Sequence, residues 1–172
     1  IEYRKGGYWL LKRGEQPREY QLKLYHIPHD GKIQEVASFI NHYNAILQTS
    51  ILYADRESNL LMLMLDHQWI ELNYLTGEQR IFDIPLLKEN QFRVFDIAST
   101  QKGLWWIGTS EGLLKIERKE ETYQFELFNT QNSGLRNNNC ASLLSDSTND
   151  SLLWIGTKGG GLHRMNTQTM DF

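Results

Sequence analysis

The chain has 172 residues, which is enough for one domain with a hydrophobic core. Hydrophobic residues make up 40% of it and charged residues 23%, which excludes an intrinsically disordered composition. The formal net charge of -3 leaves no basic excess to hold a nucleic-acid backbone, so nucleic acid is not expected as a partner of this segment.

Two further features bear on the class of protein. Cys140 is the only cysteine, so no disulfide can form within the chain and no cysteine-based metal site is expected. The longest apolar run, residues 60–65, is far shorter than the roughly 20 residues of a membrane-spanning helix. The chain begins without an initiator methionine or a signal-peptide core and stops within an expected strand, so we expect a piece of a longer protein.

The first segment, residues 1–44, carries no clear repeat motif. Residues 32–43 place apolar side chains at helical spacing, although a strand of the first repeat unit is due there. Residues 26–30 read His-Ile-Pro-His-Asp, but zinc would need further ligands in a fixed geometry. The proline and the glycine that follows favour a surface turn, so no metal site is predicted.

The second segment, residues 45–91, alternates short apolar runs with turn residues. Apolar runs at 60–65 and 69–72 are followed by a predicted turn at 76–77 and a closing strand at 80–84. The first of these runs reads Leu-Leu-Met-Leu-Met-Leu, without polar alternation. Such a run is typical of a strand that is covered on both faces.

The last two segments repeat one another. Residues 103–116 read GLWWIGTSEGLLKI and residues 151–165 read SLLWIGTKGGGLHRM, so Trp-Ile-Gly-Thr recurs after 48 positions. Each unit contains four short strand-like runs, and four strands in about 45 residues is the pattern of a β-propeller blade. We therefore predict an all-β fold, a partial β-propeller of three to four four-stranded antiparallel blades. The predicted boundaries are a degenerate blade portion at 1–44, blades at 45–91 and 92–138, and an incomplete blade at 139–172.

The repeated Trp-Ile-Gly-Thr is interpreted as a core strand that occurs once in each blade. Its glycine leaves room for the close approach of another backbone, and regular apolar spacing places Trp106 and Trp154 in the core. A carbohydrate-stacking platform formed by these tryptophans is the alternative. Trp105 replaces the Leu153 of the other copy, which marks it either for additional core volume or for ligand contact.

Motifs of catalytic or cofactor chemistry are absent from the sequence. The glycines of residues 156–161 precede a strand-like run, whereas a phosphate loop opens a helix, so a turn is predicted. Residues 146–151 lack the spacing of a calcium loop and are interpreted as a solvated turn. No Gly-x-Ser-x-Gly motif occurs, and Cys140 falls on an apolar core position. No catalytic residue and no cofactor is predicted.

Residues 104–116, 152–165 and 133–146 together resemble the two-component regulator propeller repeat. Trp-Ile-Gly-Thr, a following Gly-Leu and a Gly-Leu-x-x-Asn pattern recur in that order at one period. The resemblance implies the periplasmic sensor region of Bacteroidetes hybrid two-component system histidine kinase/response regulators. In that family, usually seven-bladed propellers precede an immunoglobulin-like domain, a membrane helix and a histidine kinase, and the signals are often glycans.

The resemblance favours an extracytoplasmic ligand-sensing module that responds to glycans or oligosaccharides and is not itself catalytic. Two other classes stay open. One is a propeller enzyme acting on polysaccharide, whose carboxylate distances the sequence does not give. The other is a protein-interaction scaffold, against which the missing Gly-His and Trp-Asp marks count.

The expected partners follow from the same resemblance. They are an oligosaccharide ligand, the remaining blades of the parent propeller and a second copy of the chain, with membrane contact only through the parent protein. Loops and exposed aromatic residues would carry ligand recognition. The candidate ligand-binding residues are Trp9, Tyr43, Trp69 and Trp105.

Overall fold

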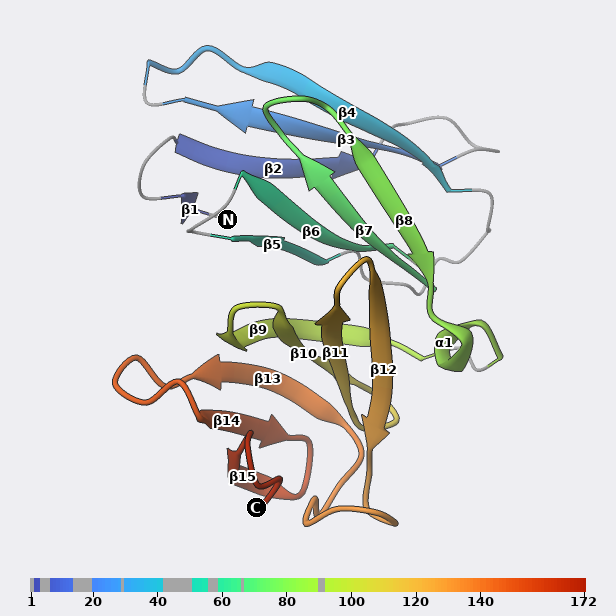
Figure 1. The fold of residues 1–172 in the computed structure, drawn as a ribbon, viewed down its shortest axis with the longest axis vertical. Coiled ribbons are helices and arrows are strands. Elements are labelled where there is room, and N and C mark those ends of the chain that lie inside the picture. Colours follow the sequence, from blue (N-terminus) through green and yellow to red (C-terminus); the bar gives the residue numbers. More distant parts are fainter. Residues whose placement is uncertain are drawn as a thin grey trace. The chain divides into compact units, whose positions relative to one another are not determined.

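The computed structural model contains two compact units, Ile1–Ile81 and Phe82–Phe172. Four antiparallel sheets provide nearly all of the regular structure (Figure 1), and each unit is built around two of them. The all-β prediction is therefore confirmed, and the sheets are those of a partial propeller-like fold. The described residues are 2–3, 7–13, 20–28, 30–41, 51–55, 59–65, 67–89 and 92–172.

The first unit contains two sheets with strand orders β1-β2-β3-β4 and β5-β6-β7-β8. Each strand pairs with its neighbour in sequence, because short turns join antiparallel strands directly. The predicted turn at 76–77 is confirmed: Asn73 Oδ1 accepts the N–H groups of Leu75 and Thr76, at 3.0 and 3.2 Å. The strands are β1 Glu2–Tyr3, β2 Gly7–Arg13, β3 Tyr20–Ile27, β4 Gln34–Asn41, β5 Ile51–Ala54, β6 Leu60–Leu65, β7 Gln68–Asn73 and β8 Gln79–Asp83.

Strand β6 lies in the core of the first unit. Residues 61–65 are all buried, as the unbroken apolar run predicted, since a strand covered on both faces needs no polar alternation. Leu61, Leu63 and Leu65 cluster with Leu24 of β3. Residues 32–43 do not form a helix, despite their helical spacing of apolar residues. Residues 34–41 form the strand β4, in which Ala37 pairs with Leu24 of β3.

The second unit begins with a short helix and contains the two sheets β12-β11-β10-β9 and β13-β14-β15. The helix was not predicted from the sequence. Pro85 at its first position suits a helix start, and Leu87 is buried. The elements are α1 Pro85–Glu89, β9 Val94–Gln101, β10 Leu104–Thr109, β11 Leu113–Lys119, β12 Thr122–Phe128, β13 Cys140–Ser145, β14 Leu152–Thr157 and β15 Gly161–Asn166.

The two sheets of the second unit pack on one another through a shared apolar core. Trp106 of β10 is fully buried in it, together with Cys140 and Leu143 of β13 and Ile155 of β14. The prediction that Trp-Ile-Gly-Thr forms a core strand is confirmed for the first copy. The four sheets formed by the described residues fall one in each of the four predicted segments, whose limits stay a prediction.

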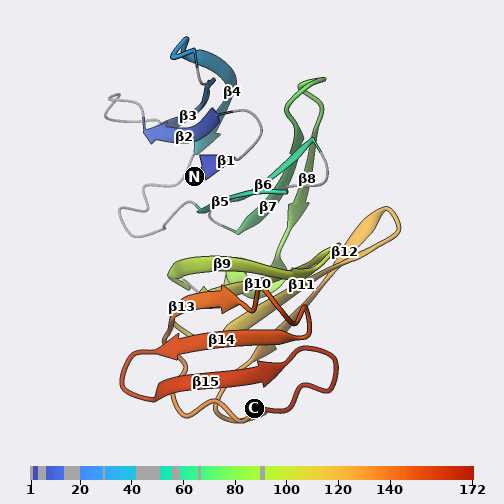
Figure 2. The same ribbon diagram turned by 90° about the vertical axis from the view of Figure 1, so that its left-hand side faces the viewer.

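The inner strands β9 and β13 lie side by side (Figures 1 and 2) and fix the spacing between the two sheets. The main-chain N–H of Leu143 donates to Asp96 Oδ2 at 2.7 Å. A Cβ added to Gly108 would lie 2.3 Å from the carbonyl oxygen of Cys140. The predicted close backbone approach at this glycine is thus present, and no other residue type fits the position.

The threonine of each Trp-Ile-Gly-Thr closes the turn that follows it. Thr109 Oγ1 donates to the carbonyl oxygen of Gly112 at 2.8 Å, and Thr157 Oγ1 donates to that of Gly161 at 2.9 Å. Gly112 and Gly161 both have a left-handed φ, +144° and +82°. The repeated sequence therefore encodes a repeated turn, and the predicted turn at 156–161 is confirmed.

Replacing Gly108 with alanine is expected to lower the free energy of unfolding by about 1–3 kcal/mol, because the new Cβ would collide with a backbone carbonyl that cannot turn away. The matched variant Gly156→Ala places its Cβ 2.3 Å from the Ser142 hydroxyl, which can adopt another rotamer, so little loss is expected. Urea unfolding of both variants measures the difference. Equal losses would contradict the account of the close approach at Gly108.

Candidate functional site

The four aromatic residues proposed as ligand contacts lie in different surroundings. Trp9 is on β2, but its side chain is outside the described residues, and so is the whole of Tyr43. Trp69 of β7 is 0% exposed and Trp105 of β10 is 2% exposed, so both indoles are packed in the interior. Trp69 and Trp105 therefore do not form a surface patch. The role of the four residues in ligand binding stays a prediction.

Trp105 belongs to an aromatic cluster. Its ring centroid lies 6.0 Å from that of Tyr123 on β12, and Tyr123 meets Phe82 edge-on at 4.7 Å. Edge-on and tilted ring pairs of this kind add about 0.5–1.5 kcal/mol beyond the burial of apolar area. The larger side chain at this position, where the other copy has Leu153, therefore supplies core volume.

An open groove of about 370 Å³ lies on the outer strands β11 and β12. Lys115 pairs with Glu126 across these strands, and Glu117 pairs with Gln124, so the four side chains share one face of the sheet. The same face continues onto β10, where Lys115 pairs with the buried Trp106. The groove is thus the polar continuation of an apolar face. Its lining residues are Lys115, Glu117, Gln124, Phe125 and Glu126.

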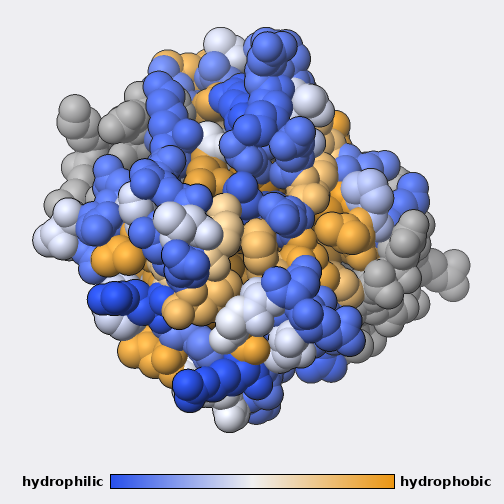
Figure 3. Space-filling view, turned by 60° about the horizontal axis from the view of Figure 1, so that its bottom comes forward, coloured by the Kyte–Doolittle hydropathy of each residue, from blue (hydrophilic) through white to orange (hydrophobic). Residues whose placement is uncertain are grey.

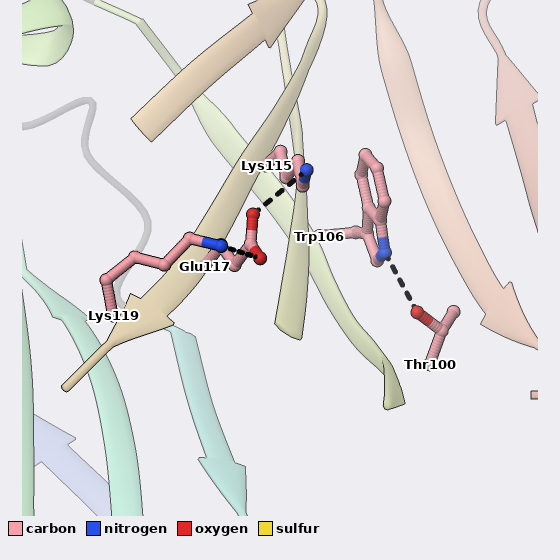
Figure 4. A network of polar contacts seen from close by, with 5 residues as sticks. All are labelled: Thr100, Trp106, Lys115, Glu117 and Lys119. Carbon is pink, nitrogen blue, oxygen red and sulfur yellow. Dashed lines mark hydrogen bonds and ion pairs between the residues drawn. The ribbon is translucent and has the colours of Figure 1, made fainter. Parts of the chain in front are cut away.

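Two lysines hold the carboxylate of Glu117 in the groove (Figure 4). Lys115 Nζ lies 3.1 Å from Glu117 Oε2, and Lys119 bonds the other carboxylate oxygen. The bond from Lys119 is the main reason why the pKa of Glu117 is lowered, and Lys115 acts in the same direction while burial opposes both. The side chain of Lys115 is only 15% exposed, so its packing and this ion pair fix its position.

The groove offers hydrogen-bonding groups of both signs. Carboxylates accept hydrogen bonds, the ammonium donates them, and an amide such as that of Gln124 does both. A neutral ligand rich in hydroxyl groups matches such a mixture, whereas a general acid needs a carboxyl with a raised pKa, which Glu117 does not have. Sequence reasoning missed these residues, although the alternation of Lys115, Glu117 and Lys119 was a readable signal of one strand face.

The two tryptophans of the repeat make the same hydrogen bond. Trp106 Nε1 donates to Thr100 Oγ1 at 3.0 Å (Figure 4), and Trp154 Nε1 donates to Asp146 Oδ2 at 3.3 Å. The acceptor Thr100 lies near the end of β9, and the acceptor Asp146 directly follows β13. Both strands are the inner strands of their sheets. Trp106 is fully buried, but Trp154 is only half-buried.

Asp146 begins the predicted solvated turn at 146–151, which is confirmed. Its Oδ1 accepts the main-chain N–H of Thr148 at 2.9 Å and the Thr148 hydroxyl at 2.6 Å. These bonds to Thr148, followed by that from the Trp154 indole, hold the pKa of Asp146 at about 2, below its ordinary 3.8. The carboxylate is therefore a structural acceptor that orders the turn.

The remaining nucleophilic and metal-binding side chains are dispersed. Cys140 is buried, as expected for an apolar core position, and burial raises the pKa of its thiol to about 12. His163 is also buried, and its Nε2 accepts the main-chain N–H of Arg136 at 3.2 Å. No group of three or more His, Cys, Asp or Glu that could hold a metal ion occurs among the described residues, and His29 of the 26–30 motif is not among them.

Solved structures similar to this chain include extracellular domains from B. thetaiotaomicron. That of BT4673, described as a one-component system, aligns over 87% of this chain and 20% of its own length, with 16% identity and a TM-score of 0.58. The same domain, described as part of a hybrid two-component system, aligns over 95% and 22%, with 16% identity and a TM-score of 0.56. That of the hybrid two-component system BT3049 aligns over 97% and 24%, with 15% identity and a TM-score of 0.58. The chain has the fold of part of these domains.

These structures are of the class that the repeat resembles, and their extracellular origin agrees with the predicted periplasmic location. The chain spans about a fifth to a quarter of their length. No protein-family model matches the chain, and no curated protein sequence does. Within the described residues, none of the helices has the length and hydropathy to cross a membrane.

Asp146 is expected to titrate with a midpoint near pH 2 in the folded chain. Because folding lowers this pKa, the stability that the ionised carboxylate contributes is complete above about pH 4 and is lost as the pH falls toward 2. Replacing Thr148 with alanine removes the main bond and should raise the midpoint toward 3.8. NMR titration of the carboxyl carbon checks both values, and a midpoint near 3.8 in the unmodified chain would contradict the bonding described.

Proposed function

We propose that this chain is part of an extracytoplasmic sensor region of a hybrid two-component signalling protein, and that it contributes to the recognition of glycans or oligosaccharides. The observation that carries the proposal is the fold, which aligns over 95–97% of the chain with extracellular domains described as parts of hybrid two-component systems. The Trp-Ile-Gly-Thr repeat supports the same class independently, because it is a feature of the sequence and not of the fold. The chain itself is non-catalytic in this proposal.

The groove on β11 and β12 is the proposed place of ligand contact. Sugar hydroxyls both donate and accept hydrogen bonds, and the groove supplies a carboxylate at Glu126, an amide at Gln124 and an ammonium at Lys115. Its charges of opposite sign nearly balance, which suits a neutral ligand better than an anionic one. The ionised Glu117 fits recognition and does not fit proton donation in glycoside hydrolysis.

Signal transmission would follow from a change in the arrangement of two protomers. A ligand shifts an equilibrium between two arrangements only by the difference in its affinity for them. Binding at the propeller would therefore change the state of a kinase in the parent protein if one arrangement presents the groove in a better geometry. This step requires a homo-oligomer, which is proposed here together with the sensor role.

Replacing Gln124 or Glu126 with alanine is expected to weaken the binding of a recognised oligosaccharide about tenfold each, the equivalent of about 1.4 kcal/mol for one or two lost hydrogen bonds. Gln168→Ala, at an exposed turn position outside the groove, is the matched control and should leave the affinity unchanged. Isothermal titration calorimetry against a panel of neutral oligosaccharides measures these affinities. Binding that none of the groove variants alters would place the ligand elsewhere.

The coding sequence around this segment gives a second test of the proposed function. Further repeats, one apolar segment of about 20 residues and a histidine kinase are expected in the same reading frame. Addition of a bound oligosaccharide should then change autophosphorylation of the full protein. A frame that continues into a hydrolase or lyase, or release of new reducing ends on incubation with the oligosaccharides, would contradict a non-catalytic sensor.

A further inference from the structure

The outer strand β12 forms an open edge of its sheet. It ends the strand order β12-β11-β10-β9 (Figure 1). Natural proteins protect such edges with prolines, lysines, bulges or short strands, because an open row of N–H and C=O groups pairs readily with another strand. β12 has none of these features: it reads TYQFELF and pairs with β11 along its whole length without a shift in register. By contrast, β8 has five residues and is soon followed by Pro85.

Two contacts show which main-chain groups of β12 point to this edge. The carbonyl oxygen of Leu127 accepts Asn132 Nδ2 at 2.9 Å and so points away from β11. The carbonyl oxygen of the next residue, Phe128, lies against Gly112 beside β11. Main-chain groups alternate in direction along a strand, so the N–H and C=O of Phe125 point to the open edge as those of Leu127 do. An added strand can therefore pair at Phe125, whereas Asn132 already occupies the edge at Leu127.

The polar face beside this edge carries its charges unevenly. Glu117 binds both Lys115 and Lys119, which leaves β11 with a net positive charge on this face. Glu126 of β12 forms no ion pair within the described part of the chain. Lys119 lies opposite Thr122, near the turn, and Glu126 lies farther along β12. The negative charge of β12 and the outermost positive charge of β11 are therefore at different levels of the strands.

We propose that two copies of the chain pair through β12, antiparallel and about a two-fold axis at Gln124, so that both copies form one ligand surface. The inference rests on the proposed function, which requires two copies, and adds where they meet. This register places Glu126 opposite the partner's Thr122 and one strand away from the partner's Lys119, so opposite charges meet twice across the axis. Phe125 exchanges main-chain hydrogen bonds with the added strand.

The neighbouring registers fit less well. A two-fold axis at Phe125 would place the added strand over Leu127, where the Asn132 side chain is bound. An axis at Glu126 would place two carboxylates opposite one another, which is destabilising. An axis at Gln124 places two amides opposite one another, and an amide both donates and accepts hydrogen bonds. The side chains of β12 therefore favour one register.

The exposed leucines of the last sheet mark a different surface. Leu144 of β13 is 65% exposed and Leu162 of β15 is 69% exposed. Figure 3 views the molecule from the end at which β15 lies, and apolar residues are open there among polar ones. The remaining blades of the parent propeller are expected on this side, since the chain spans only about a fifth to a quarter of the similar domains. Sheets that pack face to face leave the edge of an outer strand such as β12 open.

Pairing through β12 would join the two grooves into one surface. The polar face of β11 and β12 continues across the axis onto the same two strands of the second copy. A ligand that spans the axis contacts Gln124 and Glu126 of both copies. Such a ligand binds the pair better than the single chain and raises the fraction of paired chains. This difference in affinity is the link between ligand binding and the arrangement of two protomers.

A cysteine at the axis tests the register. Opposed residues that exchange no main-chain hydrogen bonds have Cα atoms about 4.5 Å apart, a distance that a disulfide spans. Gln124→Cys is therefore expected to give a disulfide-linked dimer with oxidised glutathione, which is reduced as the two thiols are oxidised. Gln168→Cys, at an exposed turn outside β12, is the matched control and should stay monomeric on a non-reducing gel. Equal cross-linking of both variants would overturn the proposal.

Charge variants at Thr122 test the complementarity. Thr122→Glu would face the partner's Glu126 and should raise the dissociation constant of the dimer about tenfold, since two such pairs form in each dimer. Thr122→Lys brings the opposite charge and should lower this constant. Sedimentation over a range of concentrations measures both, with Gln168→Glu as the control for a change in net charge. Equal effects of Thr122→Glu and Gln168→Glu, or no dimer at any concentration with or without oligosaccharide, would contradict the interface.

The interface and the proposed function can fail separately. A neutral oligosaccharide that the chain binds should raise the fraction of dimer, and Thr122→Glu should weaken its binding. Oligosaccharide binding by a chain that stays monomeric would overturn the shared surface and leave the sensor role standing. Dimerisation as described, without binding of any oligosaccharide of the panel, would instead overturn glycan recognition and leave the β12 interface standing.

Discussion

The absence of a side chain at Gly108 determines how the two sheets of the second unit meet. The Cys140 carbonyl occupies the space that a Cβ would need, so the inner strand β13 lies directly on the Trp-Ile-Gly-Thr strand. Leu143 keeps its register with Ile155 of β14, and its main-chain N–H donates to Asp96 of β9. A buried N–H without a partner would cost about 1–3 kcal/mol, so the glycine and the aspartate depend on one another.

The core and the groove of this unit are two ends of one sheet surface. Apolar residues near β9 and β10 face the next sheet, and Trp106 is fully buried among them. Farther out, on β11 and β12, the same face carries Lys115, Glu117 and Glu126 and becomes concave. Rigid strands hold these polar groups, and a rigid scaffold lowers the entropy that a ligand must overcome on binding. A sensor of the proposed kind would thus recognise its ligand from the outer strands while the inner strands maintain the sheet-to-sheet contact.

The repeat is more regular in the structure than in the sequence. Threonine closes the turn after both core strands. Asparagine orders two other turns, because Asn73 and Asn166 each accept two main-chain N–H groups through Oδ1. Gly77 takes the left-handed conformation in one of these turns, and Met170 takes it in the other. Hydrogen bonds to short polar side chains therefore preserve a turn after the glycine that usually marks it has changed.

The sequence alone determined the strands, the four-strand repeat and the burial of Cys140, because these follow from local apolar runs and from turn residues. Only the tertiary structure decided which of the two motifs is buried, since Trp106 and Trp154 are both followed by Ile-Gly-Thr but have different neighbours in space. The groove was equally hidden, because cross-strand register brings Lys115 to Glu126 and Glu117 to Gln124. Strand register depends on residues that are far apart in the sequence, and so does the choice of which sheet packs on the face of another. Neither is a local property of the chain.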